Sequence, residues 1–163
     1  MLALSQTAGY VIAAMAQLNP PEEKPKLVRE VAVEAGIPPA YLSKVVHQLG
    51  ESGLLISRRG RNGGITLSRS PDEISLLQIC EAVEGAQLLK RCLLGLETCT
   101  DERACPTHEF WKPMREKIRE RLSSLTLADV MRLEGKAWRT QLNLPLAWGI
   151  DAKSLEQGAG SLG

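Results

Sequence analysis

Apolar residues recur at helical spacing in three stretches of the N-terminal part of the chain. Residues 4–18 and 26–35 place apolar side chains three or four positions apart, which is the pattern of a helix with one buried face. The second stretch ends at Gly36, a residue typical of a helix C-terminus. A third helix is predicted over residues 39–51, because Pro39 suits the first turn of a helix, where the backbone N–H has no partner.

Two short strand-like runs follow the third predicted helix, at residues 54–57 and 64–67. The loop between them contains Gly60, Asn62 and Gly63, and a connection of this composition between two short strands predicts a hairpin. Two helices joined by a short turn and followed by a hairpin have the sequence form of a winged helix-turn-helix. We therefore predict a mainly α fold with a winged helix-turn-helix in its N-terminal part.

The C-terminal half of the chain predicts further helices. One is expected over residues 75–84 and a longer, highly charged one over residues 107–125, in which Pro113 predicts a kink or a later start. A capping box at 126–129 predicts a last helix that runs to about residue 137.

Composition and charge narrow the class of protein. With 163 residues the chain holds one compact domain, or a small domain and an appendage, and its 4% of aromatic residues argues against an all-β sandwich. The formal net charge of +1 excludes a uniformly basic coat. Residues 37–70 nevertheless carry five basic residues and one acidic residue, and the rest carries 15 basic and 18 acidic ones. Positive charge is therefore concentrated on the predicted helix-turn-helix and hairpin.

The apolar pattern also predicts in which cellular compartment the protein is found. The N-terminal stretch lacks the basic leader of a signal peptide, and no run of about 18 uncharged apolar residues occurs. We expect a cytoplasmic protein without a membrane segment, in which thiols stay reduced.

Polar side chains on the outer face of the third predicted helix have the size needed to reach base edges and phosphates. The hairpin loop adds three arginines without an acidic neighbour, and its glycines allow close backbone approach to a groove. The alternative is a solvated polar helix and an ordinary surface hairpin. The residues predicted to contact double-stranded DNA are Pro39, Ala40, Tyr41, Ser43, Lys44, His47, Arg58, Arg59, Gly60, Arg61 and Asn62.

Three cysteines and a histidine fall in and just after an aperiodic segment, in the spacing Cys92-x₆-Cys99-x₅-Cys105-x₂-His108. Structural zinc sites usually pair cysteines two to four residues apart, so the wider gaps favour an iron–sulfur cluster. The alternative is inert surface cysteines with an incidental histidine. Cys80 lies within an apolar helix pattern and is expected to be a small core residue. No oxyanion hole, substrate pocket or phosphate loop is indicated, so neither an enzyme nor a small-molecule substrate is predicted.

Taken together these motifs resemble the IscR-type (Rrf-family) winged-helix transcription regulators, which include the IscR, NsrR, RirA and CymR groups. The resemblance spans roughly residues 1–135. It rests on Leu4-Ser5 and Gly9-Tyr10, Val31-Ala32-x₃-Gly36-Ile37-Pro38-x₂-Tyr41-Leu42, Leu49-x₃-Gly53-Leu54-Leu55, Arg59-Gly60-Arg61-Asn62-Gly63-Gly64, the three cysteines, and Cys105-Pro106-Thr107-His108-x₂-Trp111.

The resemblance implies a domain organisation and a set of partners. Residues 1–85 would form the DNA-binding domain, 86–108 a cluster-binding loop and 107–140 dimerisation helices. The composition of the last residues separately predicts a flexible tail over 141–163. A homodimer would bury the stripe that contains Phe110, Trp111 and Ile118, and would bind a near-palindromic operator. By the same resemblance Cys92, Cys99, Cys105 and His108 would hold an iron–sulfur cluster, with 2Fe-2S favoured and 4Fe-4S as the alternative.

The function predicted from the sequence is a DNA-binding transcription regulator, a repressor by preference, that senses iron, redox state or nitric oxide through this cluster. One alternative is a cluster-free, thiol-sensing regulator of the CymR kind. The other is an iron–sulfur carrier or assembly protein that uses its winged helix to bind proteins.

Overall fold

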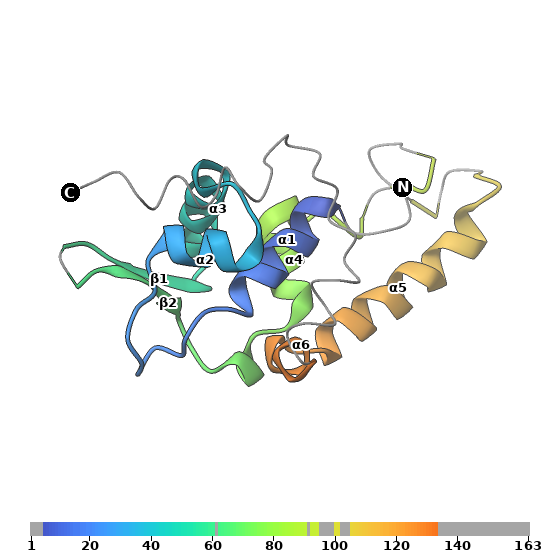
Figure 1. The fold of residues 1–163 in the computed structure, drawn as a ribbon. Coiled ribbons are helices and arrows are strands. Elements are labelled where there is room, and N and C mark those ends of the chain that lie inside the picture. Colours follow the sequence, from blue (N-terminus) through green and yellow to red (C-terminus); the bar gives the residue numbers. More distant parts are fainter. Residues whose placement is uncertain (1–4, 61, 91, 95–99, 102–104, 134–163) are drawn as a thin grey trace.

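The computed structural model describes residues 5–60, 62–90, 92–94, 100–101 and 105–133. Within these ranges no helix is long and apolar enough to cross a membrane. Helices dominate, with one small antiparallel sheet (Figure 1). The elements are α1 (Gln6–Met15), α2 (Val28–Ala35), α3 (Pro39–Glu51), β1 (Leu55–Arg58), β2 (Gly64–Leu67), the 3-10 helix η1 (Pro71–Glu73), α4 (Leu76–Glu84), α5 (His108–Ser124) and α6 (Leu127–Arg132).

The core lies between the first four helices. Helix α1 packs against α2 and α4, and α3 packs against α2, α4 and β1. Each helix turns its predicted apolar face inward, because burying that face removes the most apolar surface from water. On α3 the buried residues are Leu42, Val45, Val46 and Leu49, as the spacing predicted.

The turn between α2 and α3 confirms the predicted helix stop. Gly36 adopts a left-handed backbone conformation with φ +67°, which glycine reaches without a steric penalty. The backbone N–H of Ile37 then donates to the carbonyl of Ala32 at 2.8 Å, so the open end of α2 is capped. Helix α3 begins at Pro39, as predicted.

The hairpin of the wing pairs β1 with β2 in a register that runs from Leu55 opposite Leu67 to Arg58 opposite Gly64. The predicted strand at 54–57 is thus shifted by one residue. The backbone N–H and C=O of Lys26 bond to the C=O and N–H of Ile65 at 3.1 and 2.8 Å. This pairing corrects the predicted helix over residues 26–35, because the backbone of Lys26 is used by the hairpin and α2 starts two residues later.

Helix α5 runs away from the α1–α4 body (Figure 1). It begins at His108 and contains Pro113. The helix therefore does not start after the proline, which was one of the two predicted possibilities. Proline removes a hydrogen bond to the carbonyl four residues earlier, that of Glu109. Both residues are exposed, so water can hydrate that carbonyl.

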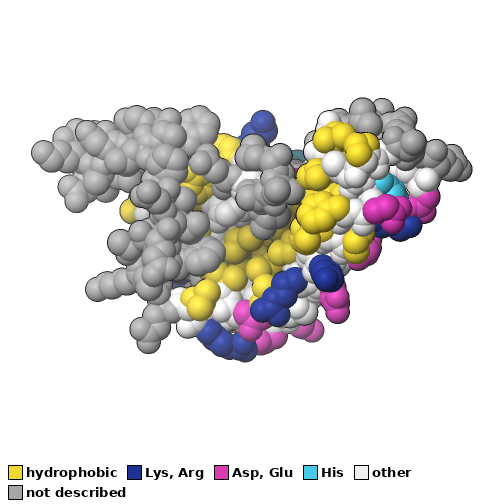
Figure 2. Space-filling view, turned by 90° about the vertical axis from the view of Figure 1, so that its right-hand side faces the viewer, with side chains coloured by type: hydrophobic (Ala, Val, Ile, Leu, Met, Phe, Trp, Pro, Cys, Tyr) yellow, Lys and Arg dark blue, Asp and Glu magenta, His cyan; other side chains and the backbone are white. Residues whose placement is uncertain are grey.

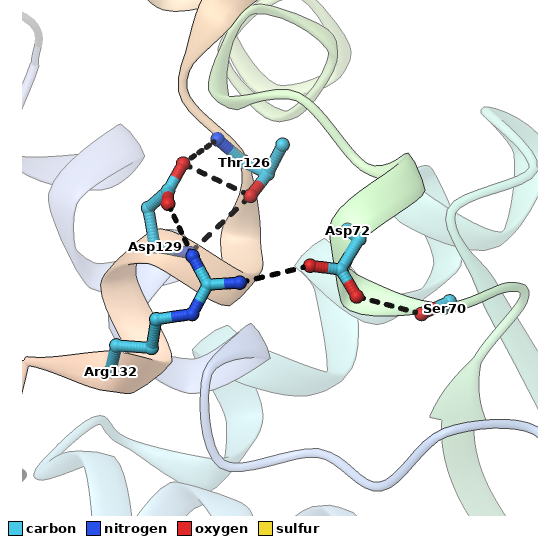
Figure 3. A network of polar contacts seen from close by, with 5 residues as sticks. All are labelled: Ser70, Asp72, Thr126, Asp129 and Arg132. Atoms are coloured by element: carbon cyan, nitrogen blue, oxygen red, sulfur yellow. Dashed lines mark hydrogen bonds and ion pairs between the residues drawn. The ribbon is translucent and has the colours of Figure 1, made fainter.

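A capping box joins α5 to α6 (Figure 3). The backbone N–H of Thr126 donates to the Asp129 carboxylate at 2.9 Å, and the backbone N–H of Asp129 donates to the Thr126 hydroxyl at 3.3 Å. The Thr126 hydroxyl also donates to the Asp129 carboxylate, at 3.1 Å. The bond from the Thr126 backbone, and after it the bond from the hydroxyl, hold the pKa of Asp129 below its ordinary value. Arg132 bridges Asp129 at 2.7 Å and Asp72 at 3.3 Å. The predicted capping box is confirmed, and Arg132 attaches α6 to η1.

Candidate DNA-binding face and cysteine loop

The outer face of α3 presents most of the residues predicted to contact DNA. Pro39, Ala40, Ser43, Lys44 and His47 are exposed. The hydroxyl of Ser43 donates to the carbonyl of Pro39 at 2.9 Å, within the helix. His47 lies 3.4 Å from the carboxylate of Glu51, one turn further along α3.

Tyr41 differs from the other members of this set. Its ring is half-buried and packs against the core, and its hydroxyl donates to the Thr7 hydroxyl at 3.0 Å. Tyr41 therefore attaches the start of α3 to α1. The sequence pattern placed it outward or at the border of the apolar face, and the packing of α1 decides between the two.

The loop of the wing is closed by backbone contacts. The N–H of Gly63 donates to the carbonyl of Gly60 at 2.9 Å. A Cβ at Gly63 would lie 2.3 Å from the carbonyl oxygen of Arg58, so the tight turn needs glycine there. Arg58, Arg59, Gly60 and Asn62 are exposed, and Arg61 lies outside the described residues. The turn therefore projects at least two guanidinium groups into solvent.

A side-chain contact that the sequence did not indicate holds α3 against α4. The amide of Gln48 donates to the carbonyls of Ala82 and Val83 at 2.7 and 3.4 Å. Glu81 on the same helix pairs with Arg119 of α5 at 3.3 Å. Helix α4 is thus bonded to α3 through Gln48 and to α5 through Arg119.

Two of the three loop cysteines lie together. Cys92 is buried, Cys105 is half-buried, and Cys99 lies outside the described residues. The sulfur of Cys105 is 3.2 Å from the Thr107 hydroxyl, and the side chain of Cys92 lies close to it. The Thr107 contacts, with a smaller contribution from Cys92, hold the pKa of the Cys105 thiol below its ordinary value. A lowered pKa makes the Cys105 thiol easier to ionise, and thiolate is the form that binds metals.

Cys80 behaves as the core residue that its apolar surroundings predicted. It is fully buried. Burial, together with the charges of Glu84 and Glu81, raises the pKa of its thiol to about 11. A thiol of this kind stays protonated and is unreactive at neutral pH.

His108 is the first residue of α5 and comes three residues after Cys105 in the sequence. It is buried, with 6% of its surface exposed. Its Nε2 lies 2.7 Å from the carboxylate of Asp101, which also accepts two hydrogen bonds from the Lys112 ammonium, at 2.7 and 2.9 Å. These two partners, Lys112 before His108, hold the pKa of Asp101 below its ordinary value. The sequence pattern gave no sign that Asp101 would contact His108.

The described part of the chain contains no group of three or more His, Cys, Asp or Glu side chains arranged to hold a metal ion. Cys99, the third predicted ligand, lies outside this part. The structure thus places Cys92 and Cys105 near one another and His108 beside the carboxylate of Asp101. The complete ligand set stays a prediction.

The apolar stripe predicted on α5 is divided by the fold. Trp111 is buried, and Leu122 and Leu125 pack against the core. Phe110 and Met114 remain 58% and 37% exposed. Figure 2 shows a band of hydrophobic side chains across the side of the molecule that carries α5, with charged side chains along its lower edge. One part of the stripe is thus buried within the single chain, and the other part, with Phe110 and Met114, is exposed on its surface.

Known proteins of similar sequence are regulators. The family model described as an iron-dependent transcriptional regulator, Rrf2, matches residues 4–133. An HTH-type transcriptional regulator of Aquifex aeolicus is 30% identical over 134 residues, which cover 81% of this chain and 93% of that protein. The regulator IscR of Serratia proteamaculans is 30% identical over 129 residues, which cover 78% of each chain.

Solved structures agree with this assignment. CymR, the global cysteine regulator of B. subtilis, superposes with a TM-score of 0.66 at 29% identity, covering 81% of this chain and 98% of its own. IscR of T. potens superposes with a TM-score of 0.61 at 28% identity, covering 80% and 87%. These matches confirm the predicted winged-helix fold. The chain belongs to the Rrf2 family of transcriptional regulators, which are DNA-binding proteins and not enzymes.

Proposed function

We propose that the chain is a homodimeric repressor that reports iron, redox state or nitric oxide through an iron–sulfur cluster held by Cys92, Cys99, Cys105 and His108. The observation that carries the proposal is that the buried Cys92 lies close to Cys105, and that Cys105 comes three residues before the buried His108 at the start of α5. Two soft sulfur donors and an imidazole in one loop are a donor set that suits such a cluster. A bound cluster supplies one-electron redox chemistry and a site of attack for small oxidants and nitric oxide.

The contacts of α5 support a route by which the loop acts on the DNA-binding face. The loop is continuous with the start of α5, and Arg115 of α5 donates to the carbonyl of Lys90 at 3.2 Å. Arg119 binds Glu81 on α4, and α4 receives the Gln48 amide of α3. A loop with two arrangements would therefore shift α5, and with it α3, between two positions.

Dimerisation through α5 is part of the proposal. Phe110 and Met114 are exposed in the single chain, and a second copy that covers them would remove apolar surface from water. Two recognition helices related by a twofold axis would then enter successive major grooves of a near-palindromic operator. The proposed DNA contacts are the exposed α3 and wing residues described above, together with Tyr41 and Arg61.

Replacing Cys92 with alanine tests the cluster. We expect the anaerobically purified wild type to contain iron and sulfide, and Cys92→Ala to lose both and to change its affinity for operator DNA. Cys80→Ala is the matched control, because Cys80 lies in the core outside the loop, and should retain iron and sulfide. A wild type without iron and sulfide, combined with unchanged DNA binding in Cys92→Ala, would exclude cluster sensing.

A thiol-sensing regulator is the second candidate, and the closeness of Cys92 to Cys105 favours it too. The likeness to CymR supports it at the level of the fold. An iron-free wild type whose DNA affinity responds to peroxide, while Cys92→Ala does not respond, would favour this candidate over the cluster.

The arginines of the wing provide a separate test of DNA binding. On a mixed-sequence duplex, Arg58→Ala/Arg59→Ala should weaken binding and reduce the slope of log affinity against log salt by about 2, because each phosphate contact contributes about 1. Fluorescence anisotropy across a salt series measures this slope. Lys117→Ala, an exposed cation on α5, should leave it unchanged. A wild-type affinity that barely responds to salt would instead favour a protein-binding role for the wing.

A further inference from the structure

We propose that Arg69 is a positioning residue for DNA binding: its guanidinium group fixes the base of the wing to η1 and α4 and does not contact phosphate. The sequence counts Arg69 among the five basic residues of the segment 37–70. In the structure its side chain is half-buried and bonded within the protein. The inference rests on the proposed DNA contacts of the wing and is independent of the cysteine loop.

The guanidinium group of Arg69 joins three segments of the chain. Nη1 donates to the carbonyl of Gly53 at 3.3 Å, in the turn between α3 and β1. Nε donates to the carbonyl of Glu73, the last residue of η1, at 3.2 Å. Nη2 donates to the side-chain oxygen of Gln78 on α4, also at 3.2 Å. Every nitrogen of the group is therefore bonded to an acceptor inside the protein.

The acceptors of Arg69 are themselves held in place by the fold. The side-chain oxygen of Gln78 also accepts from the backbone N–H of Ser75 at 3.0 Å, as part of the capping box of α4. The carbonyl of Gly53 also accepts from the hydroxyl of Ser68 at 2.6 Å. Ser68 and Gly53 lie at the two ends of the hairpin, so these bonds close its base, and Arg69 joins the closed base to α4.

The wing depends on such an attachment because a hairpin of two short strands has little stability of its own in water. The backbone pairing of Lys26 with Ile65 holds the β2 side of the wing, and Arg69 holds the β1 side through Gly53. A wing fixed in this way presents Arg58 and Arg59 in position before DNA arrives. Without the attachment, the wing would have to be ordered during binding, which lowers affinity.

Replacing Arg69 with methionine removes the hydrogen bonds and keeps a long side chain. On the mixed-sequence duplex used for the wing arginines, we expect Arg69→Met to weaken binding by about 10-fold, the cost of ordering one or two arginine side chains. The slope of log affinity against log salt should stay that of the wild type, because no phosphate contact is lost. Arg58→Ala/Arg59→Ala, in contrast, should reduce this slope by about 2.

The conservative variant Arg69→Lys separates geometry from charge. Lysine keeps the positive charge but lacks the planar fork of the guanidinium group, so it should bind DNA nearly as weakly as Arg69→Met. A slope that falls by about 1 in Arg69→Met would make Arg69 a phosphate contact. Either that result or wild-type affinity in Arg69→Lys would overturn the proposal.

The acceptor on α4 gives an independent test, because changing it leaves every basic residue in place. Gln78→Leu should weaken binding by a smaller factor than Arg69→Met. The double variant Arg69→Met/Gln78→Leu should bind no more weakly than Arg69→Met, since both changes break the same bond. Gln78→Glu keeps an oxygen acceptor for Arg69 and for the capping box and should bind as the wild type does. Additive losses in the double variant would contradict the proposal.

The attachment of the wing can also be followed without DNA. In the free protein, backbone amide hydrogens of β1 and β2 should exchange faster in Arg69→Met than in the wild type, with no change in α1. Arg58→Ala/Arg59→Ala is the control and should leave both unchanged. Wild-type exchange in Arg69→Met would overturn the positioning role. If Arg58→Ala/Arg59→Ala binds DNA as the wild type does, the proposed wing contacts are refuted, and the exchange rates still decide whether Arg69 fixes the wing.

Discussion

Replacing Leu49 with alanine is expected to lower the free energy of unfolding by about 2–5 kcal/mol, the cost of removing a fully buried leucine side chain and leaving a cavity. Leu49 is 1% exposed and belongs to the face of α3 that packs into the core. The interior is packed too densely to collapse around the missing atoms. Chemical denaturation at one fixed protein concentration measures the difference.

The exposed Val33 on α2 is the matched control for this substitution. It is 55% exposed, and Val33→Ala should change the unfolding free energy by less than about 0.5 kcal/mol. Because α3 carries the proposed DNA contacts, the destabilised Leu49→Ala chain should also bind DNA less well at temperatures where part of it is unfolded. Equal stability of the two variants would contradict the packing described for α3.

Replacing Gly63 with alanine is expected to disrupt the wing while leaving the helical core folded. The new Cβ would lie 2.3 Å from the Arg58 carbonyl and 2.8 Å from that of Gly60, and backbone atoms cannot yield as the end of a side chain can. The turn must open, which moves Arg58 and Arg59. Misplaced contacts worth about 1–3 kcal/mol would weaken DNA binding by roughly 5- to 150-fold.

The control for the wing is Gly50, which lies inside α3, where an added Cβ would have no neighbour from the rest of the fold within 4 Å. Gly50→Ala should stabilise the chain by about 0.5–1 kcal/mol, because alanine loses less backbone entropy in a helix. Anisotropy titrations with DNA and the circular dichroism of the helices distinguish the two glycines. Unaltered DNA affinity in Gly63→Ala would show that the wing does not contribute to binding.

Predictions from local pattern succeeded where the structure depends on neighbours in sequence. The buried face of α3, the stop at Gly36 and the capping box at Thr126 each follow from residues at most four positions apart. They failed at Lys26, because its backbone pairs with Ile65, far along the chain. The residues around Lys26 do not indicate this pairing, because the partner strand lies almost forty positions away in the sequence.

In the proposed site, too, some residues could be predicted from the sequence and others only from the structure. The spacing of the cysteines and His108 identified the candidate ligands, whereas the Asp101–Lys112 pair had no signal except one acidic residue in an aperiodic loop and a lysine on a charged helix. Their meeting depends on how the loop returns to the start of α5. Side chains from an irregular segment have no periodic direction, so only the folded backbone determines which of them face a common point.

For this protein the sequence by itself determined the helices, the wing, the family and the candidate ligand types, because helical periodicity, turn residues and cysteine spacing are local properties of the chain. Only the tertiary structure showed that Tyr41 is hydrogen-bonded to α1, Gln48 to α4 and Asp101 to His108. Each of these hydrogen bonds joins two different segments of the chain. The packing of the apolar faces determines which polar groups can pair, because it brings segments together that are distant in the sequence.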